Sequence, residues 1–301
     1  MLLQRQHRNR FSGHFYAIGA TALWSGNFII ARGLSESIPP VSLAFYRWVV
    51  AVAVFLPFAL KPLVRERDHL RAHLPYLSMT ALLGVTLFNT LIYCAGHTTT
   101  ALNLSLISIT FPIFIVILSR IIYGERITAM KSIGIVMVAL GVILLITRGN
   151  IFRLLNISFA VGDIWMLAAA IIFAIYSIAL KHKPEQLSIW AFQLSTFILG
   201  LIFLSPFFIW ESITTPAVAF DQKTVGAILY VGIFASFAAF VLWNKAIVMV
   251  GPSKTGMVYY TLPLFSGVLA NIFLGENIGI FHLYSMMLIV PGILIANYDP
   301  K

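Results

Sequence analysis

The sequence predicts an all-α integral membrane protein whose ten transmembrane helices form two inverted five-helix repeats around a central cavity. Three observations predict this fold. Hydrophobic residues make up 60% of the 301 residues, charged residues only 10%, and the mean hydropathy is +0.93. A chain of this composition exposes more apolar surface than water tolerates, so its solvent is the bilayer. The other two observations are an internal repeat and a series of apolar segments long enough to cross a membrane.

The repeat is clearest in a motif that occurs twice. FPIFIVILSRIIYGER at 111–126 returns as LPLFSGVLANIFLGEN at 262–277, so that Pro112 matches Pro263 at an offset of 151 residues (263 − 112), half of the chain. Further matches at offsets of 149 to 151 residues are Gly141 with Gly292, Thr86 with Ser236, Tyr93 with Trp243, Trp24 with Phe173, and Asn27 with Tyr176. Self-similarity at this period indicates a doubled structural unit. We therefore predict two domains, 1–150 and 151–301.

Ten apolar segments follow one another along the chain. A helix needs roughly 20 apolar residues, at about 1.5 Å each, to cross the hydrocarbon core. The predicted spans are 15–33, 40–60, 75–95, 101–122, 130–147, 161–180, 189–210, 225–243, 255–274 and 279–297. The basic start before the first span also resembles a signal peptide. Because the sixth span duplicates the first, we interpret the first as a retained anchor.

The basic residues predict the orientation of these spans. If the amino terminus is cytoplasmic, fifteen of the twenty Lys and Arg residues lie on the cytoplasmic side, four lie outside (Arg32, Arg148, Arg153 and Lys223), and Arg47 lies within a span. Cytoplasmic loops carry such an excess of positive charge, so both termini are expected to be cytoplasmic. The net charge of +10 is then explained without a nucleic-acid partner. Since five spans is an odd number, the second repeat enters the membrane in the opposite direction to the first.

Inverted repeats of this kind are typical of transporters that work by alternating access, with substrate held near the membrane midplane. The motifs ALWSGNF at 22–28, AFYRW at 44–48 and the proline with a following GE pair in the fourth and ninth spans resemble the drug/metabolite transporter superfamily. Within it, the chain is similar to EamA-type exporters and most of all to bacterial aromatic amino acid exporters. This resemblance implies export across the bacterial inner membrane. It also implies a central cavity lined by the first, third, fourth, sixth, eighth and ninth spans.

Polar and aromatic residues of these spans form the predicted substrate-binding site. Thr86, Asn89 and Tyr93 fall at steps of three and four, which places them on one face of the third span. The full set is Trp24, Asn27, Thr86, Asn89, Tyr93, Ser105, Ser108, Tyr176, Ser236, Trp243, Tyr259 and Tyr260. Such residues also serve ordinary helix packing, above all Ser105 and Ser108, and Trp243 could belong to an interfacial aromatic belt. Pro112 and Pro263 each free a backbone carbonyl, so each is either a static kink or a hinge.

Arg47 is the one charged residue well inside a predicted span. A central Arg costs roughly 2.5 to 3.5 kcal/mol on insertion scales, so it needs a partner or a path to water. Its guanidinium is a candidate contact for a substrate carboxylate. The interpretation we favour from sequence is structural: Arg47 bonds backbone carbonyls or Tyr46 and reaches toward the outer interface. The second span is not among the cavity walls that the resemblance implies.

The ionisable residues indicate no cofactor and no strong energy coupling. All ten Asp and Glu residues lie in predicted loops or at span ends, which leaves no visible carboxylate relay for protons. Transport is then expected to be facilitative, or weakly coupled through His97 or His14. The single cysteine, Cys94, and the scattered histidines give no metal site. We expect no cofactor.

The predicted function is export of amino acids, aromatic or otherwise hydrophobic. Aromatic faces with hydroxyl or indole donors, combined with amides, suit a small zwitterion with an apolar side chain. The expected partners are thus a small-molecule substrate and the lipid bilayer. The alternative is a broader metabolite or lipophilic drug exporter. An intramembrane enzyme is disfavoured because no nucleophile, carboxylate pair or metal cluster is evident, and a scaffold because both halves carry matching polar faces.

Overall fold

The computed structural model describes residues 2–34, 37–99, 101–108, 110–147, 149–156, 160–274 and 279–298. All of the regular elements in these ranges are helical. The α-helices are α1 Leu2–Gly33, α2 Pro40–Arg65, α3 Arg67–Ala72, α4 Leu74–Ala81, α5 Phe88–Thr98, α6 Ala101–Ser108, α7 Thr110–Tyr123, α8 Ala129–Ile146, α9 Val161–Ala179, α10 Ile189–Thr214, α11 Gln222–Tyr230, α12 Ala239–Val250, α13 Pro252–Val258, α14 Leu262–Leu274 and α15 Ile280–Asn297. Short 3₁₀ segments cover Ile151–Asn156, Leu180–His182 and Tyr259–Thr261.

The described residues contain six helical stretches that are long and apolar enough to span a membrane. They are Pro40–Arg65, Leu74–Thr98, Val161–His182, Ile189–Thr214, Gln222–Val250 and Ile280–Asn297, and shorter apolar helices cover Thr110–Tyr123 and Ala129–Leu145. The chain is therefore a multi-pass, all-helical membrane protein. The count of ten spans stays a prediction. Helix α1 begins well before the predicted start of the first span, because no proline interrupts the polar residues that precede it.

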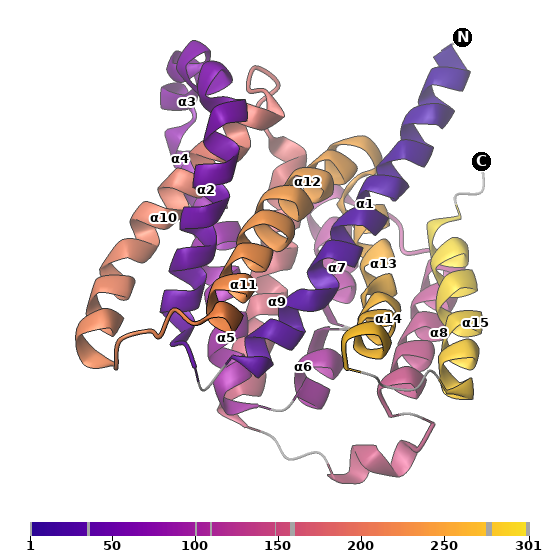
Figure 1. Cartoon of the computed structure of the whole chain (residues 1–301). Coiled ribbons are helices and arrows are strands. Elements are labelled where there is room, and N and C mark those ends of the chain that lie inside the picture. The colour runs from indigo at the N-terminus through magenta and orange to yellow at the C-terminus, as the bar shows by residue number, and fades with distance from the viewer. Residues whose placement is uncertain are drawn as a thin grey trace.

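The helices form a bundle with a tight helix pair at each edge (Figure 1). Helices α2 and α10 lie side by side at one edge, α8 and α15 at the opposite edge, and α1 and α12 pack together between them (Figure 1). Helix α1 begins, and α15 ends, at the same end of the bundle, whereas the segment Ile151–Asn156 lies at the other end (Figure 1). This arrangement fits an even number of crossings between the two chain ends.

Glycines allow α8 and α15 to pack with almost no gap. A Cβ atom added to Gly134 of α8 would lie 2.5 Å from the carbonyl oxygen of Gly292 in α15. The reverse substitution also clashes, since a Cβ on Gly292 would lie 2.8 Å from the Val138 side chain and 3.0 Å from the Gly134 oxygen. Small residues at such contacts let membrane helices approach closely and gain van der Waals contact.

The third and eighth spans are each interrupted by a π-helical segment at a matching place. The segment Leu82–Leu87 separates α4 from α5, and Val231–Ala238 separates α11 from α12. The residues Thr86 and Ser236 lie in these segments, at the offset of 150 residues (236 − 86) that aligns the two halves. A π segment leaves the ordinary i−4 hydrogen-bond ladder, and such segments are frequent at functional sites.

Two glutamates join α2 and α10 at both ends of their antiparallel contact. Glu211, in the last turns of α10, accepts hydrogen bonds from the backbone N–H groups of Val41 and Ser42 at 3.1 and 2.6 Å, and from the Ser42 hydroxyl at 2.8 Å. Glu66, which follows α2, accepts from the backbone N–H of Ser188 at 2.8 Å. Each carboxylate thus satisfies orphan donors at the start of the partner helix, where negative charge also suits the helix dipole.

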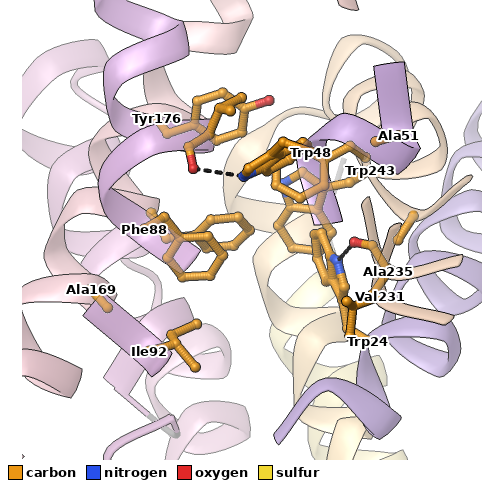
Figure 2. Packing of buried hydrophobic residues seen from close by; sticks show 14 of the residues in the cluster. Trp24, Trp48, Ala51, Phe88, Ile92, Ala169, Tyr176, Val231, Ala235 and Trp243 are labelled. Carbon is orange, nitrogen blue, oxygen red and sulfur yellow. Dashed lines mark hydrogen bonds between the residues drawn. The ribbon is translucent and has the colours of Figure 1, made fainter. Parts of the chain in front are cut away.

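The centre of the bundle is a continuous apolar core rich in aromatic side chains. Trp48, Phe173 and Trp243 are fully buried, and Trp24 is 5% exposed. Figure 2 shows the Trp24 indole donating to the Ala235 carbonyl, at 2.8 Å. Buried indoles need such partners because lipid and apolar side chains offer none. The bond from Trp24 to Ala235 connects α1 to the π-helical part of the eighth span.

Candidate functional site

Arg47 lies at the centre of a buried polar cluster drawn from four spans. Its side chain is 0% exposed. The Nε atom donates to the Ser236 hydroxyl at 2.7 Å, and Nη1 donates to the Oδ1 atoms of Asn89 and Asn27 at 2.7 and 3.2 Å and to the Tyr93 hydroxyl. Tyr93 in turn donates to Asn27 Oδ1 at 2.9 Å. We call these five residues the Arg47 cluster.

This geometry corrects the structural interpretation of Arg47 that we favoured from sequence. Arg47 bonds the side chains of Asn27, Asn89, Tyr93 and Ser236, rather than Tyr46, and it points into the bundle rather than toward an interface. The cause is the cost of an unpaired charge in a low-dielectric interior, which amide and hydroxyl oxygens from neighbouring helices reduce. Among the described residues, the guanidinium nitrogen Nη2 has no hydrogen-bond partner. One charged donor therefore remains available.

Three aromatic residues predicted for the site, Trp24, Trp243 and Tyr259, form a second group together with Phe173 and Phe240, and we call these five residues the aromatic cluster. The Trp24 ring lies 5.1 Å from Trp243, 5.5 Å from Phe173, 5.6 Å from Phe240 and 6.2 Å from Tyr259, between ring centroids. These separations are typical of favourable ring contacts. Trp243 is 0% exposed, so it does not belong to an interfacial belt. Its position in the core is visible in Figure 2.

The Arg47 cluster and the aromatic cluster are continuous. Trp24 and Asn27 are three residues apart on α1, and Trp24 bonds the carbonyl of Ala235, which precedes Ser236. The Arg47 guanidinium also lies 5.1 Å from the Trp48 ring, whose centroid is 5.3 Å from Phe240. A charged fork, amides, hydroxyls and aromatic faces thus meet in one buried region. This combination can hold a small ligand with one polar and one apolar end.

A third group combines the predicted residue Tyr176 with two residues that the sequence analysis missed, Gln193 on the seventh predicted span and Asn244 after the eighth. Tyr176 donates to Asn244 Oδ1 at 3.1 Å, and the Asn244 amide donates to Gln193 Oε1. We call Gln193, Asn244 and Tyr176 the Gln193 cluster. Gln193 and Asn244 are 0% and 1% exposed, and the Gln193 Nε2 atom has no partner in the described part of the chain. An amide inside an apolar span was the available signal, the same one that identified Asn27 and Asn89.

Other predicted residues lie outside these groups. Thr86 bonds the Gly200 carbonyl at 3.0 Å, and Tyr260 packs in a separate apolar cluster with Val116 and Met257. Ser108 is buried, whereas the side chains of Ser105 and Glu276 lie outside the described residues.

The two prolines predicted as kinks or hinges lie in α7 and α14. Pro112 is the third residue of α7, and Pro263 is the second residue of α14, directly after the 3₁₀ turn Tyr259–Thr261. The first turn of a helix tolerates proline because its N–H groups have no intrahelical partner. Pro263 therefore coincides with a break in the ninth predicted span, whereas residue 109, just before α7, lies outside the described residues.

Comparison with known proteins identifies the family. The EamA-like transporter family matches this chain over residues 11–147 and again over 160–298. An uncharacterized transporter of Archaeoglobus fulgidus is 29% identical over 287 residues, which cover 91% of this chain and 93% of the relative. The uncharacterized transporter YyaM of Bacillus subtilis is 24% identical over 280 residues, which cover 93% of this chain and 92% of the relative.

A crystal structure with 21% sequence identity shares the fold, with a TM-score of 0.74 over 95% of this chain and 96% of that one. The family match extends over most of the chain, and every residue of the Arg47 and aromatic clusters falls within the matched ranges. Transport of a small molecule across a membrane follows from this membership. The chain is a membrane transporter that belongs to the EamA-like family of the drug/metabolite transporter superfamily.

Proposed function

We propose that this transporter exports amino acids with aromatic or other hydrophobic side chains across a bacterial inner membrane. The observation that carries the proposal is the continuity of a buried guanidinium with a cluster of aromatic rings. The amino acid carboxylate would bind Arg47 Nη2, since a guanidinium offers a fork of donors matched to carboxylate oxygens. The side chain would lie against the rings of Trp24, Trp243 and Tyr259.

The charge of the site favours this cargo over the alternative, a lipophilic drug exporter. Many lipophilic drugs are cations, and Arg47 repels a cation at close range in a low dielectric. The carboxylates nearest to the membrane interior, Asp163 and Glu211, are already bonded to Thr99 and Asn103 in one case and to the start of α2 in the other. They therefore do not offset the charge of Arg47. A zwitterion gains from the Arg47 charge and from the neutral amides of Asn27 and Asn89.

We infer that the protein works by alternating access between two inverted repeats. Matched π segments, the reciprocal carboxylates of α2 and α10, and the double family match support a doubled unit. In inverted repeats, exchange of conformation between the halves opens a central site to one side of the membrane and then to the other. The buried, mutually packed aromatic rings of this structure fit a closed intermediate of such a cycle.

Transport by the purified protein in liposomes tests the proposal. Vesicles loaded with radiolabelled phenylalanine or tryptophan should release it faster with wild-type protein than with none. Trp24→Ala and Tyr176→Ala should slow release, whereas Trp210→Ala, which removes a 68% exposed indole from the outer surface of α10, should not. Wild-type flux equal to that of empty vesicles for every hydrophobic amino acid tested would rule out this cargo.

Orientation and energy coupling are part of the same proposal. With Cys94 replaced, a cysteine at Asp68 should be shielded from an impermeant thiol reagent in intact cells, and one at Asn156 should be labelled. Strong labelling at position 68 with none at 156 would show that the topology is the inverse of the predicted one.

The proposal also predicts how transport is driven. Flux should run down the substrate gradient without an imposed proton gradient. If it requires one, coupling through His97 replaces facilitated transport, since histidine is the side chain best suited to exchange a proton near neutral pH.

A further inference from the structure

A polar cavity of about 440 Å³ opens at the end of the bundle where α15 ends, and no step of the proposed transport mechanism uses it. Its polar lining comes from both halves of the chain: Glu125 and Arg126 after α7, Lys131 in α8, Ser253 and Lys254 in α13, and Asn297 at the end of α15. The cavity shares no lining residue with the Arg47 cluster or the aromatic cluster.

The cavity carries an excess of positive charge. Three cations and one carboxylate line it, which gives a net charge of +2 (3 − 1). The Lys131 ammonium, 13% exposed, donates to the Ser253 hydroxyl at 2.7 Å and lies 4.0 Å from Glu125. Glu125 also lies 3.7 Å from Lys181, so this carboxylate is shared between two ammonium groups. A concave basic surface that is partly withdrawn from water attracts anions.

The buried side chain of Asn297 indicates which hydrogen-bonding groups the ligand carries. Both its Oδ1 and its Nδ2 atoms are buried, and neither has a hydrogen-bond partner among the described residues. Buried amides in native proteins are nearly always satisfied on both sides, as acceptor and as donor. The missing partner must therefore supply a donor as well as an acceptor, in addition to negative charge. A phosphate ester with a neighbouring hydroxyl group has all three properties.

Exposed apolar residues beside the cavity favour a lipid as the source of this ester. Ile127 and Met130 are 42% and 47% exposed, and each is adjacent in sequence to a cation of the lining. Basic pockets between transmembrane helices near the membrane surface bind the headgroups of anionic lipids. We propose that this cavity binds the headgroup of a phospholipid of the phosphatidylglycerol type, with its phosphate at Arg126 and Lys131 and its hydroxyls at Asn297.

Lipid binding by the full-length protein in neutral detergent tests the site without any transport measurement, so its outcome is independent of the cargo. Native mass spectrometry would follow titrations with dioleoyl phosphatidylglycerol, dioleoyl phosphatidylcholine and glycerol 3-phosphate. We expect saturable binding of phosphatidylglycerol at one site, and weaker binding of the other two. If glycerol 3-phosphate binds as tightly as phosphatidylglycerol, the ligand is a soluble phosphate ester and the lipid assignment is wrong.

Arg126→Gln combined with Lys131→Gln should weaken phosphatidylglycerol binding roughly thirtyfold, since each Lys or Arg beside an anionic headgroup contributes about a factor of five. The matched control is Lys61→Gln with Arg71→Gln, which removes two exposed cations around α3, away from the cavity lining. Equal losses in the two double variants would overturn the site.

Two single substitutions keep the test decisive if the double variant does not fold. Arg126→Gln alone, at an exposed side chain, should weaken binding about fivefold. Asn297→Leu retains every charge but should abolish the preference for phosphatidylglycerol over phosphatidic acid, which lacks the hydroxyls. An unchanged preference would contradict the role of Asn297.

Discussion

The polar clusters centred on α2 and α10 differ in charge. Arg47 is the eighth residue of α2, and Gln193 is the fifth residue of α10. Arg47 donates to four side chains from three other spans. The Gln193 side chain accepts a hydrogen bond from the Asn244 amide, whose oxygen accepts in turn from the Tyr176 hydroxyl.

This difference indicates how one architecture can hold an asymmetric ligand. A doubled unit with two identical centres would bind two identical groups, whereas a charged and a neutral centre distinguish the two ends of a zwitterion. The charge also has a structural cost, because a buried guanidinium requires acceptors from its neighbours while an amide requires fewer. The first half of the chain supplies three of these acceptors and the second half supplies Ser236.

The largest expected effect is a loss of transport on substitution of Arg47, compared with the same substitution of Gln193. Arg47→Met should reduce amino acid transport in proteoliposomes about a hundredfold, since hydrogen bonds to charged groups contribute about 1.5–3 kcal/mol each and 1.4 kcal/mol is tenfold. Gln193→Met removes only neutral bonds of about 1 kcal/mol and should cost less than tenfold. Arg47→Lys keeps the charge without the fork and should lie between them. Equal losses for Arg47→Met and Gln193→Met would show that the charge has no special role.

A second comparison concerns the carboxylates that join α2 to α10. Glu211→Gln should lower the free energy of unfolding by about 2 kcal/mol. The amide NH₂ group of Gln takes the place of one buried carboxylate oxygen and cannot accept the hydrogen bonds that backbone and hydroxyl donors make to it. Glu66→Gln should cost about 1 kcal/mol, as Glu66 accepts fewer bonds. Thermal unfolding in detergent measures both, and Glu185→Gln, at an exposed position, is the control. A larger loss for Glu66→Gln would reverse the order that the hydrogen bonds predict.

Substitution of the two prolines tests whether the two halves move at the fourth and ninth predicted spans. Pro112→Ala and Pro263→Ala should each change the maximal transport rate about threefold and leave the half-saturating concentration within about twofold, as expected for a gating step rather than for binding. Rates over a range of substrate concentrations separate the two parameters. Unchanged rates in both variants would identify both prolines as static features of their helices.

The smallest effect is a pH dependence at Glu66, which lies between α2 and α3. Burial alone would favour the neutral carboxyl, but hydrogen bonds from Ser188 and Arg65 lower the pKa of Glu66 below its ordinary value. Its stabilising contribution is therefore present above the unfolded pKa of about 4.3 and is lost as pH falls through the lower folded value. The unfolding temperature of wild-type protein should fall by a few degrees more than that of Glu66→Gln between pH 5 and pH 3. Parallel curves would exclude the contribution.

The sequence predicted the helical membrane fold and many members of the site, because hydropathy and helical spacing are local signals. The spacing of Asn89 and Tyr93 identified a polar face, and both residues belong to the Arg47 cluster. Spacing could not show that Arg47 reaches them, since the contact depends on how α2 packs against α5. Glu211 was recognised as a residue at a span end, but its bonds to the start of α2, about 170 residues away, are tertiary information.

The bond between Glu211 and the start of α2 also affects how the chain is made. The donors at Val41 and Ser42 enter the membrane early in synthesis, whereas their acceptor is translated 169 to 170 residues later. Until then these N–H groups depend on water or lipid headgroups for partners. Completion of α10 thus supplies the acceptor that these donors at the start of α2 lack until then.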